Sequence, residues 1–229
     1  ATLREARKGR APDVIAAAKV CELAGAHQIT VHLRQDRRHI QDRDVEALSQ
    51  TLLVRLNLEM AAVDEIVAIA HRVGPQCVCL VPENRQEVTT EGGLDVAGQR
   101  NRLREVVRGM HDRGIKVSMF IDPETDQVNA SAEVGADYVE LHTGAYANAA
   151  PMEVLPELNR LAVAASRAIA AAVVVNAGHG LTIHNLPAVA AFPGLNEVNI
   201  GHSIISRAVF VGLDAAVKEI LAILQRYSH

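Results

Sequence analysis

Short segments of the chain alternate between apolar and polar residues, the pattern of β-strands that bury one face. Residues 28–34 read QITVHLR, so isoleucine, valine and leucine share one face while threonine, histidine and arginine share the other. Residues 55–60 read RLNLEM and repeat this scheme, with Asn57 and Glu59 on the polar face. Comparable segments predict seven strands, centred near residues 29, 57, 79, 118, 139, 174 and 198.

Between these strands, apolar residues recur three and four positions apart, as on the buried stripe of a helix. Residues 103–110 and residues 213–224 are two examples. Residues 1–12 are basic and contain glycine and proline, so we expect a loop there, followed by a helix from Pro12 or Asp13 to about Ala24. Strands that alternate with helices predict an α/β fold with a parallel sheet.

The polar face of the strands distinguishes between two α/β architectures. Sheets covered by helices on both sides, as in doubly wound folds, are usually apolar on both faces. A (β/α)8 TIM barrel packs its apolar strand face on the helices, and its inner face leads to the catalytic mouth. The second face here carries Thr30, Asn57, Ser118, Glu140, Asn176 and Asn199. We therefore predict a single TIM-barrel domain over residues 1–229, with the doubly wound open sheet as the alternative.

Seven strands are one fewer than a closed barrel of this type contains. The chain begins at Ala1 in a segment that reads as a βα loop, so we expect the first strand to be missing from the given sequence. Roughly a dozen upstream residues would form that strand and its flanks. The hypothesis predicts a one-strand gap between the strands near Val31 and Val198, next to Ala1.

Composition narrows the class of protein further. The formal net charge is -4, which argues against a nucleic-acid-binding protein. No apolar run approaches the length of a membrane span. Cys21, Cys77 and Cys79 have neither the number nor the spacing of a disulfide framework or a zinc site. We expect them to be core thiols in a reducing compartment.

Two glycine turns follow predicted strands in the last quarter of the sequence. Gly178 and Gly180 flank His179, and Gly201 precedes His202 at the start of a helical run. Glycine lets the backbone approach a ligand closely, and a helix N-terminus is suited to phosphate. Because TIM barrels keep their phosphate site in this part of the fold, we expect a phosphate group to bind at these turns.

Titratable side chains gather at the predicted carboxyl ends of the strands, where barrel enzymes keep their reactive residues. They are His32, Arg34, Glu59, Glu140, His142, His179 and His202. Taken alone, each histidine is more often structural, and Glu59 could form a structural pair with His32 or Arg34. Because several strand ends carry such side chains, an active site is favoured over a set of separate structural roles. No strand ends in lysine, so we expect acid–base catalysis rather than a lysine Schiff base.

Residues 82–98 form a long polar connection in which Gly92 and Gly93 could act as a hinge. Such connections are often lids over active sites, and Thr89 and Thr90 would offer hydroxyl groups to a ligand. A surface insertion without a function is the alternative interpretation.

Several long motifs span the chain. They are ATLREAR, ITVHLRQDRRHIQDRDV, RLNLEM, LVPENRQEVTTEGGLDVAGQ, VELHTGAYA, VNAGHGLTIHN and NIGHSIISRAVFVGL. Together they resemble the pyridoxine 5′-phosphate synthase family. The resemblance implies a cytoplasmic (β/α)8 barrel that assembles as a homo-octamer and requires no cofactor and no metal. It also implies the condensation of 1-deoxy-D-xylulose 5-phosphate with 3-amino-2-oxopropyl phosphate, with release of phosphate and water.

The resemblance assigns roles to residues whose motifs match. The acid–base positions are His32 and Glu59, with His179 as proton donor and Glu140 as transition-state stabiliser. The positions that hold deoxyxylulose phosphate are Arg34, His39 and Thr89, and those that hold the aminoketone phosphate are Arg7, Gly180, Gly201 and His202. The family's first strand ends in an Asn-x-Asp-His segment that contributes substrate ligands, and this segment is not in the sequence.

Two other functions remain open at this stage. A metal-dependent sugar-phosphate epimerase or aldolase would also be a phosphate-binding barrel with histidines at strand ends, and metal analysis would distinguish it. A non-catalytic barrel that binds a phosphorylated metabolite is the second alternative. Product formation from the two substrates would exclude it.

Overall fold

A computed structural model describes residues 1–83 and 92–227 of the chain. It contains a sheet of seven parallel strands in which each strand pairs with the next one in sequence. The strands are β1 (Gln28–His32), β2 (Arg55–Met60), β3 (Cys77–Leu80), β4 (Lys116–Ile121), β5 (Tyr138–His142), β6 (Val174–Gly178) and β7 (Leu195–Asn199). All seven predicted strands are therefore confirmed.

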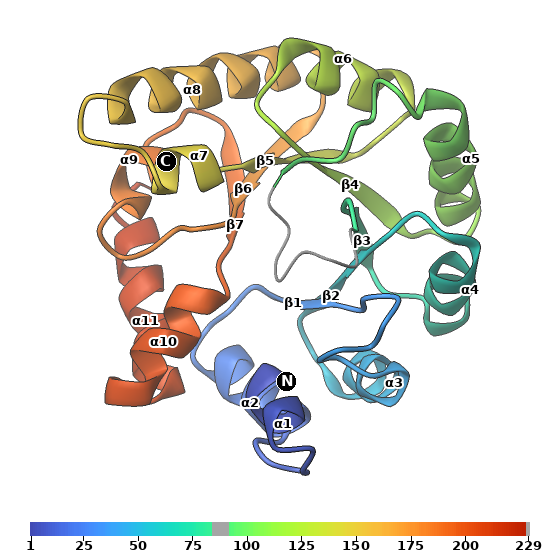
Figure 1. The fold of residues 1–229 in the computed structure, drawn as a ribbon, viewed down its shortest axis with the longest axis vertical. Coiled ribbons are helices and arrows are strands. Elements are labelled where there is room, and N and C mark those ends of the chain that lie inside the picture. The colour runs from blue at the N-terminus through green and yellow to red at the C-terminus, as the bar shows by residue number, and fades with distance from the viewer. Residues whose placement is uncertain (84–91, 228–229) are drawn as a thin grey trace.

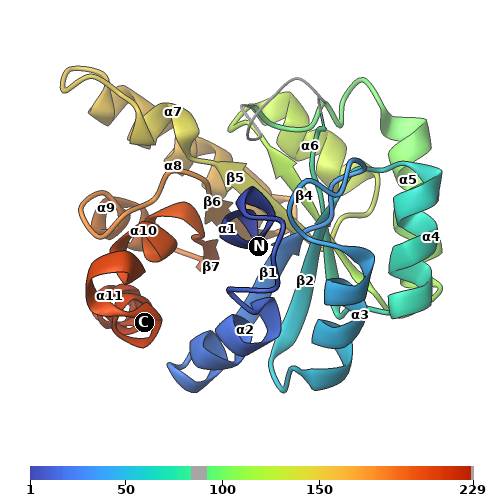
Figure 2. The same ribbon diagram turned by 60° about the horizontal axis from the view of Figure 1, so that its bottom comes forward.

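Helices lie outside the strands and surround them in both ribbon views (Figures 1 and 2). They are α1 (Thr2–Ala6), α2 (Val14–Leu23), α3 (Asp42–Thr51), α4 (Asp64–Val73), α5 (Arg100–His111), α6 (Thr125–Glu133), α7 (Gly144–Ala147), α8 (Val154–Ala170), α9 (Leu186–Ala190), α10 (His202–Val211) and α11 (Leu213–Leu224). The side chain of Asp13 caps the N-terminus of α2 by accepting hydrogen bonds from Ile15 and Ala16. The predicted helix from this position to about Ala24 is confirmed.

The first residues correct one prediction, because residues 2–6 form helix α1 rather than a loop. The Arg4 side chain is buried, and its guanidinium forms two hydrogen bonds with the Asp44 carboxylate, of 2.9 and 2.6 Å. A third bond of 2.9 Å goes to the backbone oxygen of His39. These hydrogen bonds to residues 40 and 35 positions further along the chain hold α1 in place. A helix of a single turn would not be stable through its local sequence alone.

The sheet has β1 and β7 at its two edges, and these strands are not backbone neighbours in the described part of the chain. Side chains bridge them instead. Gln28 Nε2 donates to Glu197 Oε1 at 2.5 Å, and the Thr30 hydroxyl donates to Asn199 Oδ1 at 2.8 Å. These two strands thus do not pair with each other, while the one-strand gap and the eighth strand stay predictions.

The strands have one apolar face and one polar face, as the sequence pattern predicted. Apolar side chains such as Leu56, Leu58 and Val139 are almost completely buried and belong to the main core. Polar side chains are buried as well, and they include Asn57, Ser118, Glu140 and Asn176. An apolar doubly wound sheet would not bury this polar set, so the fold is α/β with a parallel, barrel-like sheet.

None of the helices in residues 1–83 and 92–227 combines the length and hydropathy required to span a bilayer.

Candidate active site

Glu59 and Glu140 are the carboxylates at the centre of the strand-end cluster. Glu59 belongs to β2 and Glu140 to β5, and the Glu140 side chain is almost fully buried. Burial raises the pKa of Glu59 to about 7. Burial, followed by the nearby charge of Glu59, raises the pKa of Glu140 to about 8. Two carboxyl groups that titrate near neutral pH in one site are suited to general acid–base catalysis.

Two donors, the buried Cys79 and the half-buried Asn199, fix the orientation of Glu140. Asn199 Nδ2, on β7, donates to Glu140 Oε2 at 2.7 Å, and the Cys79 thiol, on β3, donates to the same oxygen at 3.7 Å. Burial and neighbouring carboxylates raise the pKa of Cys79, so the thiol keeps its proton. Side chains of two other strands, β3 and β7, therefore hold this carboxyl group in place.

His32 lies beside Glu59, with 3.8 Å between His32 Nδ1 and Glu59 Oε2. Burial and the nearby positive groups of His39 and Arg34 lower the pKa of His32 to about 3. His32 is therefore neutral at physiological pH, and it can accept or donate a proton only transiently. The rings of His32 and His39 are 6.0 Å apart, so the structure brings three predicted site residues together.

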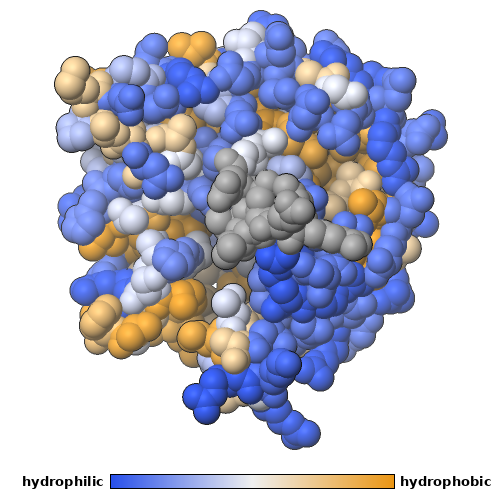
Figure 3. All heavy atoms as spheres, in the orientation of Figure 1, coloured by the Kyte–Doolittle hydropathy of each residue, from blue (hydrophilic) through white to orange (hydrophobic). Residues whose placement is uncertain are grey.

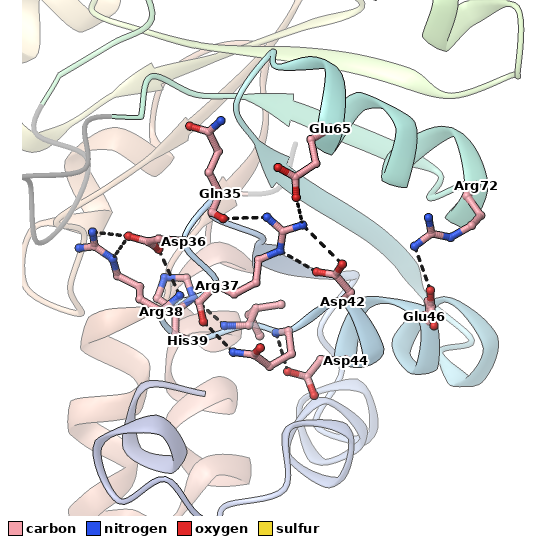
Figure 4. Close-up of polar contacts among 12 residues, drawn as sticks. Gln35, Asp36, Arg37, Arg38, His39, Asp42, Asp44, Glu46, Glu65 and Arg72 are labelled. Carbon is pink, nitrogen blue, oxygen red and sulfur yellow. Dashed lines mark hydrogen bonds and ion pairs between the residues drawn. The ribbon is translucent and has the colours of Figure 1, made fainter.

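Residues 34–41 form a loop that ion pairs hold in one conformation (Figure 4). Arg37 donates to Asp42 at 2.7 Å and to Glu65 at 2.6 Å. Arg34 is buried, and its Nε lies 3.7 Å from Asp36 and 4.0 Å from Glu83. The Arg34 charge is thus partly balanced by Asp36, which follows β1, and by Glu83, which follows β3. The family resemblance assigns Arg34 a phosphate-binding role, which stays a prediction.

His179 occupies a strained backbone position directly after β6. Its φ is 83°, in the left-handed region that side chains with a Cβ disfavour, and Gly180 follows with a φ of 74°. The Thr143 hydroxyl bonds to the backbone oxygens of Gly178 and His179 and secures this turn. Backbone strain of this kind is retained where the surrounding structure enforces it, and it is concentrated at functional sites.

The two glycine turns are neighbours, as the sequence predicted. Ser203 in the first turn of α10 donates a 2.6 Å hydrogen bond to the backbone oxygen of Leu181, which follows the first turn. Gly201 precedes α10, and no side chain caps this helix N-terminus. Gly201 and His202 are exposed. The exposed amide groups at this end of α10 are a favourable environment for an anion.

Other predicted site residues are less closely connected with this cluster. Arg7 is exposed at the end of α1. Thr89 and Thr90 lie outside the described residues, so the lid hypothesis stays a prediction. The later part of the same connection is not entirely polar surface, because Leu94 and Val96 are buried in the core.

Sequence reasoning missed several residues that contact the cluster. Asn199 and Cys79 were expected only as interior residues, yet both bind Glu140. Asp122, which was not identified at all, lies 3.0 Å from His142. Asp122 follows β4 directly, so the rule that reactive residues lie at strand ends could have found it.

An open cleft of about 810 Å³ lies between α1 and the loop after β1, and its lining includes Lys8, Arg37 and Arg38. The residues that line it do not include Glu59, Glu140 or His179. We expect the reactive part of the molecule at Glu59 and Glu140 rather than at this cleft, because the raised pKa values of these carboxyl groups suit proton transfer.

The fold and the site together define a class: parallel, barrel-like α/β proteins with acid–base residues at the carboxyl ends of their strands. Solved structures support the fold. Phosphoribosyl anthranilate isomerase from Thermus thermophilus is 15% identical, with a TM-score of 0.60 over 93% of this chain and 95% of that one. Thiamine phosphate pyrophosphorylase from Pyrococcus furiosus is 14% identical, with a TM-score of 0.61 over 96% and 93%.

Sequence comparison identifies the family within this class. The chain matches the family described as "Pyridoxal phosphate biosynthesis protein PdxJ" over residues 1–226, and it belongs to this family. The curated "Pyridoxine 5'-phosphate synthase" of Synechococcus sp. (strain JA-2-3B'a(2-13)) is 60% identical over 222 residues. That match covers 96% of this chain and 92% of the relative.

Proposed function

We propose that the chain is a pyridoxine 5′-phosphate synthase, which condenses 1-deoxy-D-xylulose 5-phosphate with 3-amino-2-oxopropyl phosphate. Family membership and a relative of 60% identity support this reaction. The observation that carries the proposal is the pair of carboxyl groups, Glu59 and Glu140, whose pKa values burial raises towards neutrality. Forming the pyridoxine ring requires proton transfers at several atoms, and such a pair is suited to them.

Each residue of the cluster has a proposed task. With a pKa near 7, Glu59 is partly ionised at neutral pH and acts as a base, beside the neutral imidazole of His32. Glu140, with a pKa of about 8, stays protonated to a higher pH than Glu59. It stabilises developing negative charge by donating a hydrogen bond. His179 donates a proton to the leaving oxygen of an elimination step.

The first covalent step is the attack of the substrate amine on the ketone, which gives an imine between the two substrates and releases the ketone oxygen as water. The positions of the lysines support this step. Lys116 begins β4, at the end opposite the carboxylates, and pairs with Asp137 at 2.6 Å. Lys19 and Lys218 pair with carboxylates on their own helices, α2 and α11. No lysine in the described residues lies at the carboxyl end of a strand, so the amine of the aminoketone phosphate, rather than an enzyme lysine, reacts with the ketone of deoxyxylulose phosphate.

Two phosphate groups need two anion sites. We assign the aminoketone phosphate to the turns at Gly180 and Gly201, with His202 and Arg7 as further ligands. The deoxyxylulose phosphate is assigned to Arg34 and His39, with Thr89 as a contact from the segment outside the described residues. The uncapped N-terminus of α10 supports the first assignment.

A phosphate or sulfate ion is expected to occupy the turns at Gly178–Gly180 and Gly201–His202 in a crystal soaked in the anion. Changing Gly201 to proline removes one amide donor and should weaken the binding of phosphate. A Gly74→Ala variant, in a left-handed helix cap with open space around it, controls for general effects of glycine replacement. Anion density elsewhere, with these turns empty, would show that the site is misplaced.

Two finer features complete the proposal. An eighth strand between β1 and β7 would close the barrel, because both strands have an unpaired edge in the described structure. The cytoplasmic homo-octamer implied by the family resemblance agrees with apolar side chains that gather over α10 and α11 (Figure 3). Ile205, Val209 and Phe210 are 47, 73 and 83% exposed on α10, and such a surface favours association between subunits.

Incubation with both substrates tests the proposed function. We expect pyridoxine 5′-phosphate and inorganic phosphate to form together, and we expect the rate to persist after exhaustive chelation. Activity that chelation removes and added metal restores would favour the metal-dependent alternative. Binding of both substrates without any product would favour the non-catalytic alternative.

A further inference from the structure

Four side chains form one polar layer inside the sheet. They come from β1, β3, β5 and β7, the kind of alternate strands that contribute a layer of side chains in a barrel, and they are Thr30, Cys79, Glu140 and Asn199. Thr30 donates a hydrogen bond to Asn199, which donates to Glu140. Cys79 donates to the same carboxyl group. Residues far apart in the sequence therefore hold Glu140 from two sides.

The contacts of Asn199 determine which end of its amide meets Glu140. Its Oδ1 accepts from the Thr30 hydroxyl at 2.8 Å and from Gln28 Nε2 at 3.2 Å. Gln28 Nε2 also donates to Glu197 Oε1 at 2.5 Å, so this nitrogen is the donor end of Gln28. Because Oδ1 of Asn199 faces these donors, its Nδ2 is directed at Glu140.

The two oxygens of the Glu140 carboxyl group have different surroundings. Oε2 accepts from Asn199 Nδ2 at 2.7 Å and from the Cys79 thiol at 3.7 Å. Within the described part of the chain, no hydrogen bond reaches Oε1. A Cβ at Gly178 would lie only 2.1 Å from Oε1, so this oxygen occupies the space that glycine leaves open, directly before His179.

We propose that Asn199 is a positioning residue that keeps Oε2 of Glu140 as an acceptor and so places the acidic proton of Glu140 on Oε1. The inference rests on the proposed function, in which protonated Glu140 stabilises developing negative charge. An oxygen that accepts an amide N–H and a thiol S–H serves as the carbonyl oxygen, so the hydroxyl group is the other one. The proton of Glu140 then lies beside the turn that carries His179, where it can be donated to a developing anion.

The titratable and charged groups around Glu140 come from several strands. They are Glu59 on β2, Cys79 on β3, Glu197 on β7 with its partner Arg55, and His179 after β6. Burial, followed by the nearby charges of Glu59 and Glu197, raises the pKa of Glu140. The hydrogen bond from Asn199 opposes this rise because it stabilises the carboxylate form. Loss of the Asn199 amide should therefore raise the pKa of Glu140 further.

The decisive variant is Asn199→Leu, which nearly keeps the shape of the side chain and removes its hydrogen bonds. We expect kcat to fall by about 10- to 100-fold with KM nearly unchanged, because Asn199 acts on the position of an acid. NMR of protein with labelled glutamate should show the pKa of Glu140 higher by about one unit. The alkaline limb of the kcat profile should move to higher pH with it.

The carbonyl stretching band of protonated Glu140 reports which oxygen carries the proton. In Asn199→Leu this band should move to higher frequency, because the carbonyl oxygen Oε2 has lost its amide donor. The Glu140→Gln variant identifies the band and the NMR resonance. Repeating these substrate-free measurements in a Glu59→Gln background lets Glu140 titrate without the neighbouring carboxyl group.

Asn196→Leu is the matched control, because Asn196 also lies on β7 and its amide donates to Asn176 at 2.9 Å instead of to Glu140. Thr30→Val is a second, milder variant. It removes the hydroxyl group that orients the Asn199 amide, so the same changes should appear at smaller size. Thr30→Ser should restore native behaviour because it keeps the hydroxyl group.

A pKa of Glu140 in Asn199→Leu equal to that in Asn196→Leu, or an unchanged carbonyl band, would overturn the proposal. If Asn199→Leu does not fold, Thr30→Val decides through the same measurements. NMR and infrared spectra are recorded without substrate, so they decide this inference separately from the proposed function. If the native protein makes no product, the proposed function fails, while a raised Glu140 pKa and a shifted band in Asn199→Leu still support the role of Asn199.

Discussion

Replacing Glu59 by glutamine is expected to lower turnover by about 10²- to 10⁴-fold while leaving the binding of both phosphorylated substrates largely intact. The amide has nearly the same shape as the carboxyl group but cannot take a proton. Glu59 lies 3.8 Å from His32 at the end of β2, and burial brings its pKa to about 7, so it is placed and tuned to act as a base. Single-turnover rates and equilibrium binding of each substrate separate the two effects.

Glu105→Gln provides the control, because Glu105 is exposed on α5 outside the cluster. Turnover of Glu59→Gln close to that of this control would remove Glu59 from the proposed mechanism.

The same variant has a consequence for stability. The pKa of Glu59 is raised in the folded state, so the protonated carboxyl group stabilises the fold fully below its ordinary pKa, near 4.5. That stabilisation is lost as the pH rises through about 7, since the partly buried anion is then unfavourable. Glu59→Gln has no such titration, so it should become more stable relative to the native protein as the pH rises from 5 to 8. The catalytic role proposed for Glu59 thus requires an ionised form that lowers the stability of the fold.

Replacing Arg4 by methionine should destabilise the fold by about 3–5 kcal/mol, because it leaves the buried Asp44 carboxylate without its partner. Arg4 and Asp44 are 4 and 6% exposed, and two hydrogen bonds join them. Asp44 also accepts from the backbone N–H of Gln41 at the start of α3, so the variant should loosen both α1 and α3. Urea unfolding followed by circular dichroism measures the effect.

The exposed ion pair between Arg72 and Glu46 supplies the control, since its side chains are 58 and 47% exposed. Arg72→Met should cost less than about 1 kcal/mol. Burial opposes ionisation of Asp44, but the hydrogen bonds from Arg4 and Gln41 lower its pKa overall. The Arg4 contribution is therefore present above the ordinary pKa near 3.8 and is lost as the pH falls through the folded value. Equal losses in Arg4→Met and Arg72→Met would show that the buried pair does not hold α1.

The sequence determined the strands and the inner polar face of the sheet by itself. Alternation in RLNLEM puts Asn57 and Glu59 on the face opposite the leucines. This arrangement follows from the two-residue period of a strand and does not depend on the rest of the chain. The glycine turn around His179 is local in the same way, because only a few residues tolerate a positive φ. Strand-end histidines and carboxylates could be predicted for these reasons.

Tertiary structure decided which of those residues meet and in which protonation state. The Arg4–Asp44 pair joins residues 40 positions apart, and no local pattern indicates that residues 2–6 become a helix. Asn199 on β7 reaches Glu140 on β5 across the intervening strand β6, a contact that only the assembled sheet provides. The pKa of Glu140 likewise depends on burial that the sequence does not encode locally. Contacts between distant strands depend on the curvature of the sheet and on side-chain packing, which arise only when all the strands are in place.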